Sequence, residues 1–216
     1  LQRIQYIKAG LAFALEDYDT CEQETQVYMD MCIGNYHRES GGYNMMRRIA
    51  YARGDIKLAF SYAYQFEQRS RYSRLQNSVS HSLLCQGTYA QMLGQTDRAA
   101  QLIAQGKAHH ERYGLKRMST YFDNLCHYHE LLEEHEEALR LREEQLAEVS
   151  EIDSADYLSY VHLQYCRLRG RMGLDLTDAL QVAYASAEKL LKPQKYLEKL
   201  KRIEAGDYRQ YDWEKA

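Results

Sequence analysis

A break in a predicted helix, followed five residues later by a small residue, recurs along the chain and constrains the fold more than any other feature. Gly54 opens one such break, and Ala59 is its small residue. The series of small residues is spaced 38, 40, 39 and 41 residues apart and consists of Cys21, Ala59, Ala99, Ala138 and Ala179. A period of about 40 residues predicts an array of stacked repeats.

Each period has room for two helices. The chain has 216 residues with one proline, Pro193, and 12 glycines, few helix breakers for its length. Apolar residues follow each break at helical spacing. The sequence therefore predicts five pairs of helices and a C-terminal helical segment: 2–15 with 18–36, 43–53 with 55–72, 75–93 with 95–113, 116–132 with 135–150, 154–172 with 175–191, and 194–216, in which the helix ends near 205.

The connections between these helices are short. The polar stretches 37–42 and 150–154 are interpreted as loops, and no linker divides residues 1–216, so a single domain is expected. Two antiparallel helices approach closely beside a short turn, which explains the small residue there. Because one hairpin cannot bury its apolar faces alone, neighbouring hairpins must stack.

This pattern resembles the tetratricopeptide-repeat (TPR) family. The resemblance is carried by Gly54 with Ala59, Gly94 with Ala99 and Glu133 with Ala138, and by the small residues Ala9, Gly87 and Cys126 twelve positions before the marker. Arg47 and Arg167 depart from it, and the period exceeds the family's usual length of about 34 residues. The resemblance implies an all-α fold, a right-handed α-solenoid of about five antiparallel helix pairs.

The resemblance also implies where a partner would bind. In a TPR-like superhelix the first helix of each pair lines the concave face. Amide side chains there can pair with an extended backbone, arginine can hold a carboxylate, and tyrosine can pack an apolar side chain. The positions carried over are Asn44, Arg48, Tyr51, Leu84, Thr88, Gln91, Asp123, His127, Glu130, Gln164 and Arg171.

Composition argues against several other classes. The net charge of −3 gives no basic surface for nucleic acid, and no apolar stretch approaches the ~18 residues that span a bilayer. Five cysteines with no Cys-x-x-Cys pair indicate buried thiols in a reducing cytoplasm. The chain starts without methionine, so we expect it to be a piece of a longer protein.

The sequence offers no pattern for catalysis. It contains no Gly-x-Ser-x-Gly and no Gly-Lys-Ser/Thr phosphate loop. Two sets of possible metal ligands share a helix face, His129 with Glu133 and Cys126 with Glu130 or His129, but the sequence has no His-Glu-x-x-His and no second thiol nearby. We therefore expect no catalytic residue, metal or cofactor.

Three functions remain open at this point. The first is a non-catalytic scaffold or adaptor that binds a peptide or protein on the concave face. The second is a ligand- or peptide-sensing regulatory module of a larger signalling or transcription-control protein, in which small shifts between helix pairs add up. The third and least favoured is an enzyme with a cryptic site. The partner and the oligomeric state are left open.

Overall fold

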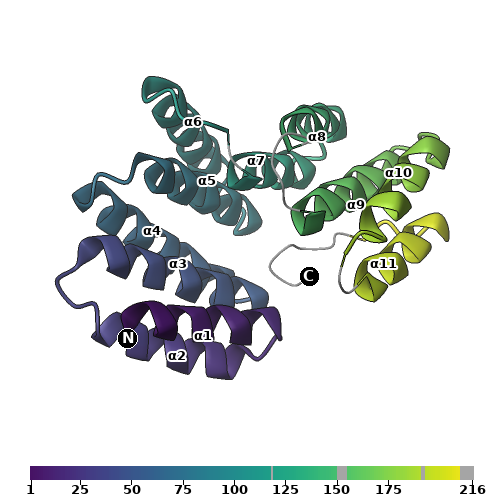
Figure 1. Cartoon of the computed structure of the whole chain (residues 1–216). Coiled ribbons are helices and arrows are strands. Elements are labelled where there is room, and N and C mark those ends of the chain that lie inside the picture. The colour runs from purple at the N-terminus through teal and green to yellow at the C-terminus, as the bar shows by residue number, and fades with distance from the viewer. Residues whose placement is uncertain (118, 150–154, 191–192, 210–216) are drawn as a thin grey trace. The chain divides into compact units, whose positions relative to one another are not determined.

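The computed structural model describes residues 1–117, 119–149, 155–190 and 193–209. These residues form eleven α-helices joined by short turns (Figure 1). In chain order the helices are α1 (Gln2–Ala14), α2 (Tyr18–Asp30), α3 (Tyr36–Ala52), α4 (Ile56–Tyr72), α5 (Gln76–Met92), α6 (Thr96–Arg112), α7 (Ser119–Leu131), α8 (His135–Val149), α9 (Ala155–Arg171), α10 (Thr177–Ala187) and α11 (Gln194–Glu204). The prediction of an all-α chain built from five helix pairs and a terminal helix is confirmed.

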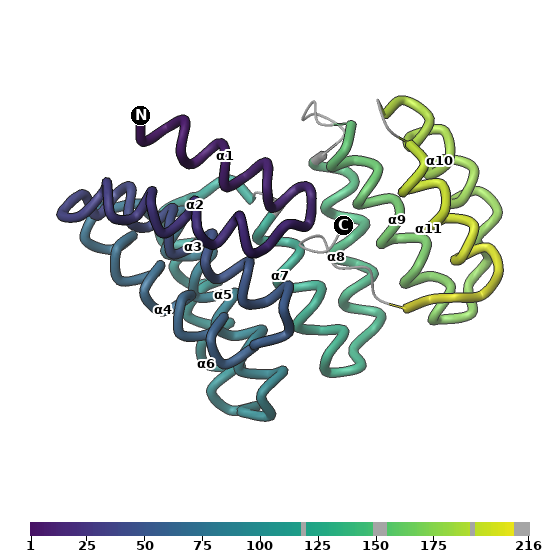
Figure 2. The backbone as a smooth tube through the Cα atoms, turned by 90° about the horizontal axis from the view of Figure 1, so that it is seen from below, coloured from purple at the N-terminus to yellow at the C-terminus, as the bar shows by residue number. Residues whose placement is uncertain are grey.

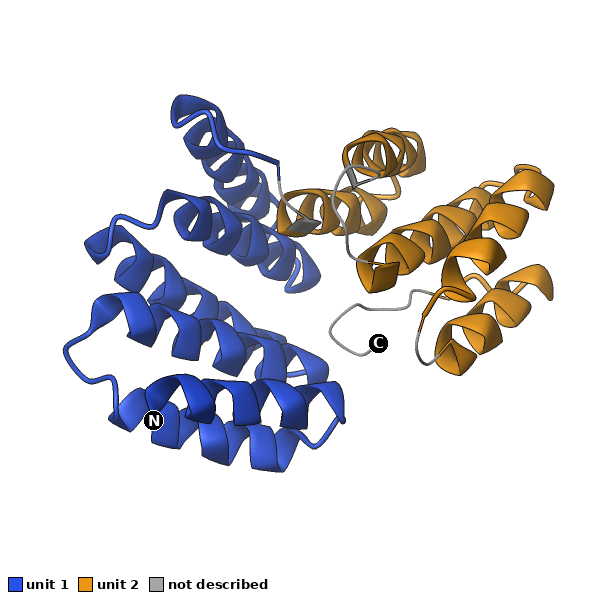
Figure 3. Ribbon diagram, in the orientation of Figure 1, with its two compact units in different colours: residues 1–117, 215 blue, residues 118–214, 216 orange. Residues whose placement is uncertain are grey.

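The helices pack into two compact units, residues 1–117 and 118–214 (Figure 3). In unit 1 each helix from α2 to α6 packs on the one before it, and successive helices run antiparallel (Figure 2). Unit 2 contains the pairs α7–α8 and α9–α10, and α11 packs on the second pair. That residues 1–216 form a single domain stays a prediction.

Five of the six turns of unit 1 share one closing geometry, and the turn at Gly34 differs because the Asn35 amide donates to the carbonyl of Cys32, three residues back. A residue with positive φ follows each helix: Glu16, Gly34, Gly54, Arg74, Gly94 and Gly114. At Gly54, where φ is 81°, the next amide donates back to the carbonyl of Ala50 at 2.9 Å, which closes the end of α3. Asp55 then caps α4 by accepting from the amide of Leu58 at 3.0 Å. Each helix break is thus encoded locally.

The loop predicted at residues 37–42 is wrong, because these residues belong to α3. The break lies earlier, at Gly34 with φ of 82°, and Asn35 caps α3 by accepting from the amide of Arg38. The glycines that suggested a loop serve helix packing instead. A Cβ atom at Gly42 would fall inside the side chain of Met29 on α2. The first two repeats therefore span 2–30 and 36–72, and the loop predicted at 150–154 lies outside the described residues.

The small residues that mark the repeat are buried where paired helices meet. Cys21, Ala59, Ala99 and Ala138 are fully buried, as the packing argument predicts. Ala179 is only partly buried. Helix α10 begins four residues after the positive-φ Gly173, whereas α4 begins two residues after Gly54, and this longer turn shifts the register of α10. The fully buried alanines of α10 are Ala183 and Ala187.

Replacing Ala99 with leucine is expected to lower the free energy of unfolding by about 1–3 kcal/mol, because the crossing of α5 and α6 has no room for three more carbon atoms. Ala100, the next residue of α6, is exposed and provides a matched control whose leucine variant should unfold like the wild type. Urea titrations followed by circular dichroism measure both. Equal stability of the two variants would mean that Ala99 does not lie at a tight crossing.

Candidate functional site

The predicted binding residues lie on the first helices α3 and α5 of unit 1 and α7 and α9 of unit 2, but several are buried. Leu84 has no exposed surface and packs against Gly106 of α6. Thr88 is 1% exposed, and its hydroxyl donates to the carbonyl of Leu84. Tyr51 is buried and stacks on Tyr89, with 5.3 Å between ring centroids. These three side chains hold the stack together and are closed to a ligand.

The other predicted residues of unit 1 keep some exposed surface. Asn44 accepts a hydrogen bond from Nε of Arg47 at 3.1 Å. The guanidinium of Arg48 lies over the ring of Phe13, 4.1 Å from its centroid. Gln91 is partly exposed, although its Oε1 atom is buried and has no hydrogen-bond partner within the described residues. Asn44, Arg48 and Gln91 therefore remain candidates for contact with a partner.

In unit 2 two of the predicted residues form a buried ion-pair network. Glu130 on α7 accepts from Nη2 of Arg167 on α9 with both carboxylate oxygens, at 2.6 and 2.5 Å. The side chains of Arg167 and Glu130 are 0% and 3% exposed. Gln164, also buried, accepts from Nε of Arg167 at 2.8 Å. Glu130 and Gln164 are therefore structural, and Arg171 keeps the most exposure while lying 3.7 Å from Glu130.

The surroundings of the buried Glu130 side chain favour its charged form. Burial alone would raise the pKa of Glu130, but the charge and hydrogen bonds of Arg167, with smaller effects of Arg142 and His127, lower it below its usual value. The remaining two predicted residues are half-buried on α7. Asp123 is paired with Arg142 of α8, whereas His127 lies one turn further along.

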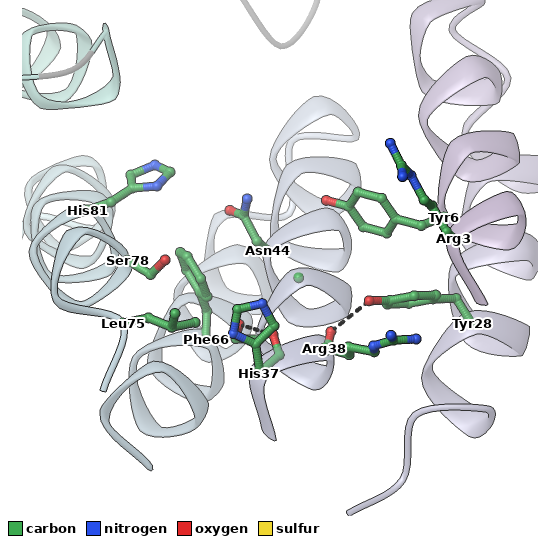
Figure 4. Close-up of a pocket in the computed structure, with 12 residues that line it drawn as sticks. Arg3, Tyr6, Tyr28, His37, Arg38, Asn44, Phe66, Leu75, Ser78 and His81 are labelled. Atoms are coloured by element: carbon green, nitrogen blue, oxygen red, sulfur yellow. Dashed lines mark hydrogen bonds between the residues drawn. The ribbon is translucent and has the colours of Figure 1, made fainter. Parts of the chain in front are cut away.

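The sequence analysis missed a cavity of about 520 Å³ in unit 1 (Figure 4). Its lining residues come from α1, α2, α3 and α4 and from the beginning of α5. Its lining consists of Arg3, Tyr6, Tyr28, His37, Arg38, Ser40, Gly41, Asn44, Phe66, Leu75, Ser78 and His81. Asn44 alone of these was predicted. Assigning residues 37–42 to a loop hid the lining residues of that stretch, because it removed the first turns of α3 from the register.

Charge in this cavity is one-sided. Arg3 and Arg38 are its charged lining residues, and it has no aspartate or glutamate. Burial, together with the positive charges of Arg47 and Arg48, lowers the pKa of His81 to about 3, so its imidazole is neutral near pH 7. Burial also raises the pKa of Tyr6, which therefore keeps its hydroxyl proton. The cavity offers positive charge and neutral hydrogen-bonding groups.

The cysteine and histidine side chains were the candidates for a reactive thiol or a metal site. All five cysteines are buried, and no disulfide joins any two of them. Burial raises the pKa of Cys126 and of Cys166 to about 12, so both are protonated, poorly nucleophilic thiols. His129 lies 2.6 Å from Glu134 rather than joining Glu133. Within the described residues no three side chains of histidine, cysteine, aspartate or glutamate gather as metal ligands would.

Comparison with known proteins decides the fold. No protein-family model matches the sequence, and no curated protein matches it either. A crystal structure from Podosopora anserina, of nearly identical TPR-like repeats described there under the name of a kinesin light chain, matches 96% of this chain over 97% of its own, with a TM-score of 0.51 and 15% identity. The chain has a TPR-like fold. A single-substitution variant of the same repeats gives a TM-score of 0.52 over 94% of each chain, also at 15% identity.

The helix lengths account for the longer repeat seen here. The pair α3–α4 combines two 17-residue helices with two short turns, so that α5 begins 40 residues after α3. None of the helices in the described parts of the chain is both long and apolar enough to cross a membrane.

Proposed function

We propose that this chain is a non-catalytic scaffold or adaptor that binds a peptide or a segment of a protein across the first helices of its TPR-like pairs. The observation that carries the proposal is the cavity of unit 1, which draws its lining from five helices belonging to three consecutive pairs. Its volume of about 520 Å³ lies in the range of ligand-binding clefts. A ligand that spans three pairs must be extended, and a peptide strand has that shape.

The chemistry of the lining supports a peptide. Tyr6, Tyr28 and Phe66 offer aromatic surface for an apolar side chain, and Asn44 offers an amide for a peptide group. Nucleophilic catalysis has less support, because the buried Cys126 thiol stays protonated. Nucleic acid binding also has less support, because the net charge of the chain is −3. The absence of a disulfide among the five cysteines agrees with a reducing compartment, and we propose a cytoplasmic location.

The second candidate is a sensing module of a larger signalling or transcription-control protein. Because the cavity takes residues from three pairs, a bound ligand would favour one arrangement of those pairs over others. This candidate uses the same cavity and differs in what binding does. It requires that a ligand change the packing of α1, α3 and α5, whereas a scaffold needs no such change.

A random library of displayed twelve-residue peptides, selected on the purified chain, tests the proposal. We expect related peptides to be enriched and to bind the wild type in fluorescence polarisation. Ser78→Trp fills the cavity from α5 and should abolish binding. Asn77→Trp is the matched control, since Asn77 is the exposed neighbour outside the lining and its variant should bind normally. Circular dichroism verifies that both variants are folded.

A second variant maps how far the binding surface extends. Arg48→Ala with Gln91→Ala removes the partly exposed predicted positions of α3 and α5, and Lys57→Ala with Gln101→Ala is its charge-matched control on second helices. Weaker binding in the first double variant alone would extend the surface along α3 and α5 of unit 1. If no peptide is enriched, or if Ser78→Trp binds like the wild type, the proposed function fails.

A further inference from the structure

We infer that two copies of this chain associate through their first helix pairs, with α1 of each copy lying on α2 of the other. The inference starts from the distribution of exposed apolar side chains. Most of the leucine, isoleucine, valine and methionine side chains that are exposed in the described residues lie within residues 1–33. They are Leu1, Ile4, Ile7, Leu11, Leu15, Val27, Met31 and Ile33. A concentration of exposed apolar surface of this kind marks an interaction site.

Helix α1 is apolar on its outer side as well as on its inner side. Ala9 and Phe13 are buried in a core cluster that includes residues of α2 and α3. On the opposite side Ile4 and Leu11 are 59% and 60% exposed, and Ile7 lies between them. A helix that is apolar all round is normally buried. The outer side of α1 therefore has the composition of a contact surface.

The repeat shows which kind of element covers this side of a first helix. One repeat spacing of 38 residues after Ile7 and Leu11, helix α3 carries Met45 and Ile49. Both are buried and share a core cluster with Cys21 of α2, the helix before α3. The corresponding residues of α5 are buried in a cluster with residues of α4, the helix before α5. A second helix thus covers this side of α3 and of α5, and a helix is the element that fits on α1.

Helix α2 of a second copy has an outer side suited to this role. Val27 and Met31, four residues apart at the end of α2, are 47% and 41% exposed and lie on one side of the helix. Helices α1 and α2 lie side by side in unit 1 (Figures 1 and 2). A twofold axis that places α1 on the α2 helix of a second copy also places α2 on the α1 helix of that copy. Both apolar sides are then covered at once, and association stops at two copies.

Charge favours a second copy as the occupant of this surface. The charged side chains of α1, Arg3 and Lys8, are both positive. The charged side chains of α2 are all negative and comprise Asp19, Glu22, Glu24 and Asp30. Lys8 and Asp30 are exposed, and neither forms an ion pair within the described residues. With α1 on the α2 helix of the other copy, helices of opposite charge meet twice, whereas α1 on α1 would bring like charges together.

Stacking of copies head to tail, with α11 of one copy on α1 of the next, has less support. The fully exposed side chains of α11 are all polar and comprise Gln194, Lys195, Glu198, Lys201, Arg202 and Glu204. Covering them with the apolar side of α1 would take charged groups out of water without giving them partners. The apolar surface available for association therefore belongs to the first helix pair.

Sedimentation velocity of the purified chain between about 1 and 100 µM tests the inference. We expect a dimer whose fraction rises with concentration. Ile4→Glu with Leu11→Glu places two carboxylates in the apolar surface and should raise the dissociation constant of the dimer tenfold or more. Leu58→Glu with Val182→Glu is the matched control, because these side chains are exposed on other helices, and it should dimerise like the wild type. Circular dichroism verifies that all variants are folded.

Exchanging charges tests how the two copies are arranged. Lys8→Glu alone and Asp30→Lys alone place like charges on facing helices, so each variant should dimerise about tenfold more weakly than the wild type. An equimolar mixture of the two variants should associate like the wild type, because both contacts of the mixed dimer again join opposite charges.

Each of three outcomes would overturn the inference. The wild type could stay monomeric over this range, which would leave the outer side of α1 to a helix of a different protein. The Ile4→Glu, Leu11→Glu variant could dimerise like the wild type, or the mixture of charge variants could associate no better than either variant alone. Positions 4, 8, 11 and 30 do not line the cavity of unit 1, so these results do not bear on the peptide binding of the proposed function.

Discussion

Replacing Arg167 with methionine is expected to lower the free energy of unfolding by about 3–5 kcal/mol, because it leaves the Glu130 carboxylate buried without its partner. The loss comes from the stranded charge and not from packing, since methionine fills much of the same volume. Urea titrations at pH 7 measure it. A matched double variant, Arg167→Met with Glu130→Leu, removes both charges and should recover most of the lost stability.

The pH dependence of the same variant provides a second test. In the wild type the pKa of Glu130 is lowered, so its contribution to stability is present above the unfolded pKa of about 4.3 and is lost as the pH falls through the folded value. Without Arg167, burial dominates and raises the pKa of Glu130 above the unfolded value. The cost of the substitution should therefore shrink as the pH is lowered from 7 to 5. A cost independent of pH, or a double variant as unstable as the single one, would show that the charge of Glu130 is not the cause.

Replacing Leu84 with alanine is expected to lower the free energy of unfolding by about 2–5 kcal/mol. Leu84 has no exposed surface and fills the contact between α5 and α6, so the variant leaves a cavity. Leu58 on α4 is 41% exposed, and its alanine variant is the matched control with little expected effect. Thermal and urea unfolding of the three proteins measure the difference.

Leu84 also tests the register of the binding surface. The TPR resemblance places it among the concave-face residues, whereas the structure buries it. Peptide binding by the folded fraction of Leu84→Ala should equal that of the wild type, because the residue does not line the cavity. A variant with normal stability and lost binding would restore the original register and remove Leu84 from the core.

The fold could be predicted from the sequence because its signals are local. A few adjacent residues determine the turn of each hairpin, as Gly54 and Asp55 do between α3 and α4. The small residue that packs near the turn follows at a fixed spacing. The boundary between α2 and α3 was mispredicted because two glycines stand inside α3. The role of Gly42 depends on Met29 of α2, and Gly41 lies against Tyr6 and Tyr28, which no local pattern reveals.

The site was harder to predict for a similar reason. Arg47 and Arg167 occupy positions where other pairs carry a small residue. Each can be buried because it donates a hydrogen bond to a residue far away in the sequence. Arg47 donates to the Tyr89 hydroxyl, 42 residues away, and Arg167 to Glu130, 37 residues away. A sequence taken alone shows neither partner. The same applies to the cavity, whose lining depends on where the first turns of α1, α3 and α5 meet.

The recurring turns of unit 1 bear on how such an array can be lengthened or shortened. Positive-φ residues recur at positions 34, 54, 74, 94 and 114, both within pairs and between them. The connections at Gly54, Arg74 and Gly94 close in the same way, with the next amide bonded to the carbonyl five residues back. Over this stretch the modular unit is a single helix with its turn, and a pair is two such modules. A duplication or deletion of the forty residues between Gly54 and Gly94 therefore joins one turn to another of the same geometry, and for a protein engineer these two turns are equivalent sites at which repeats can be exchanged.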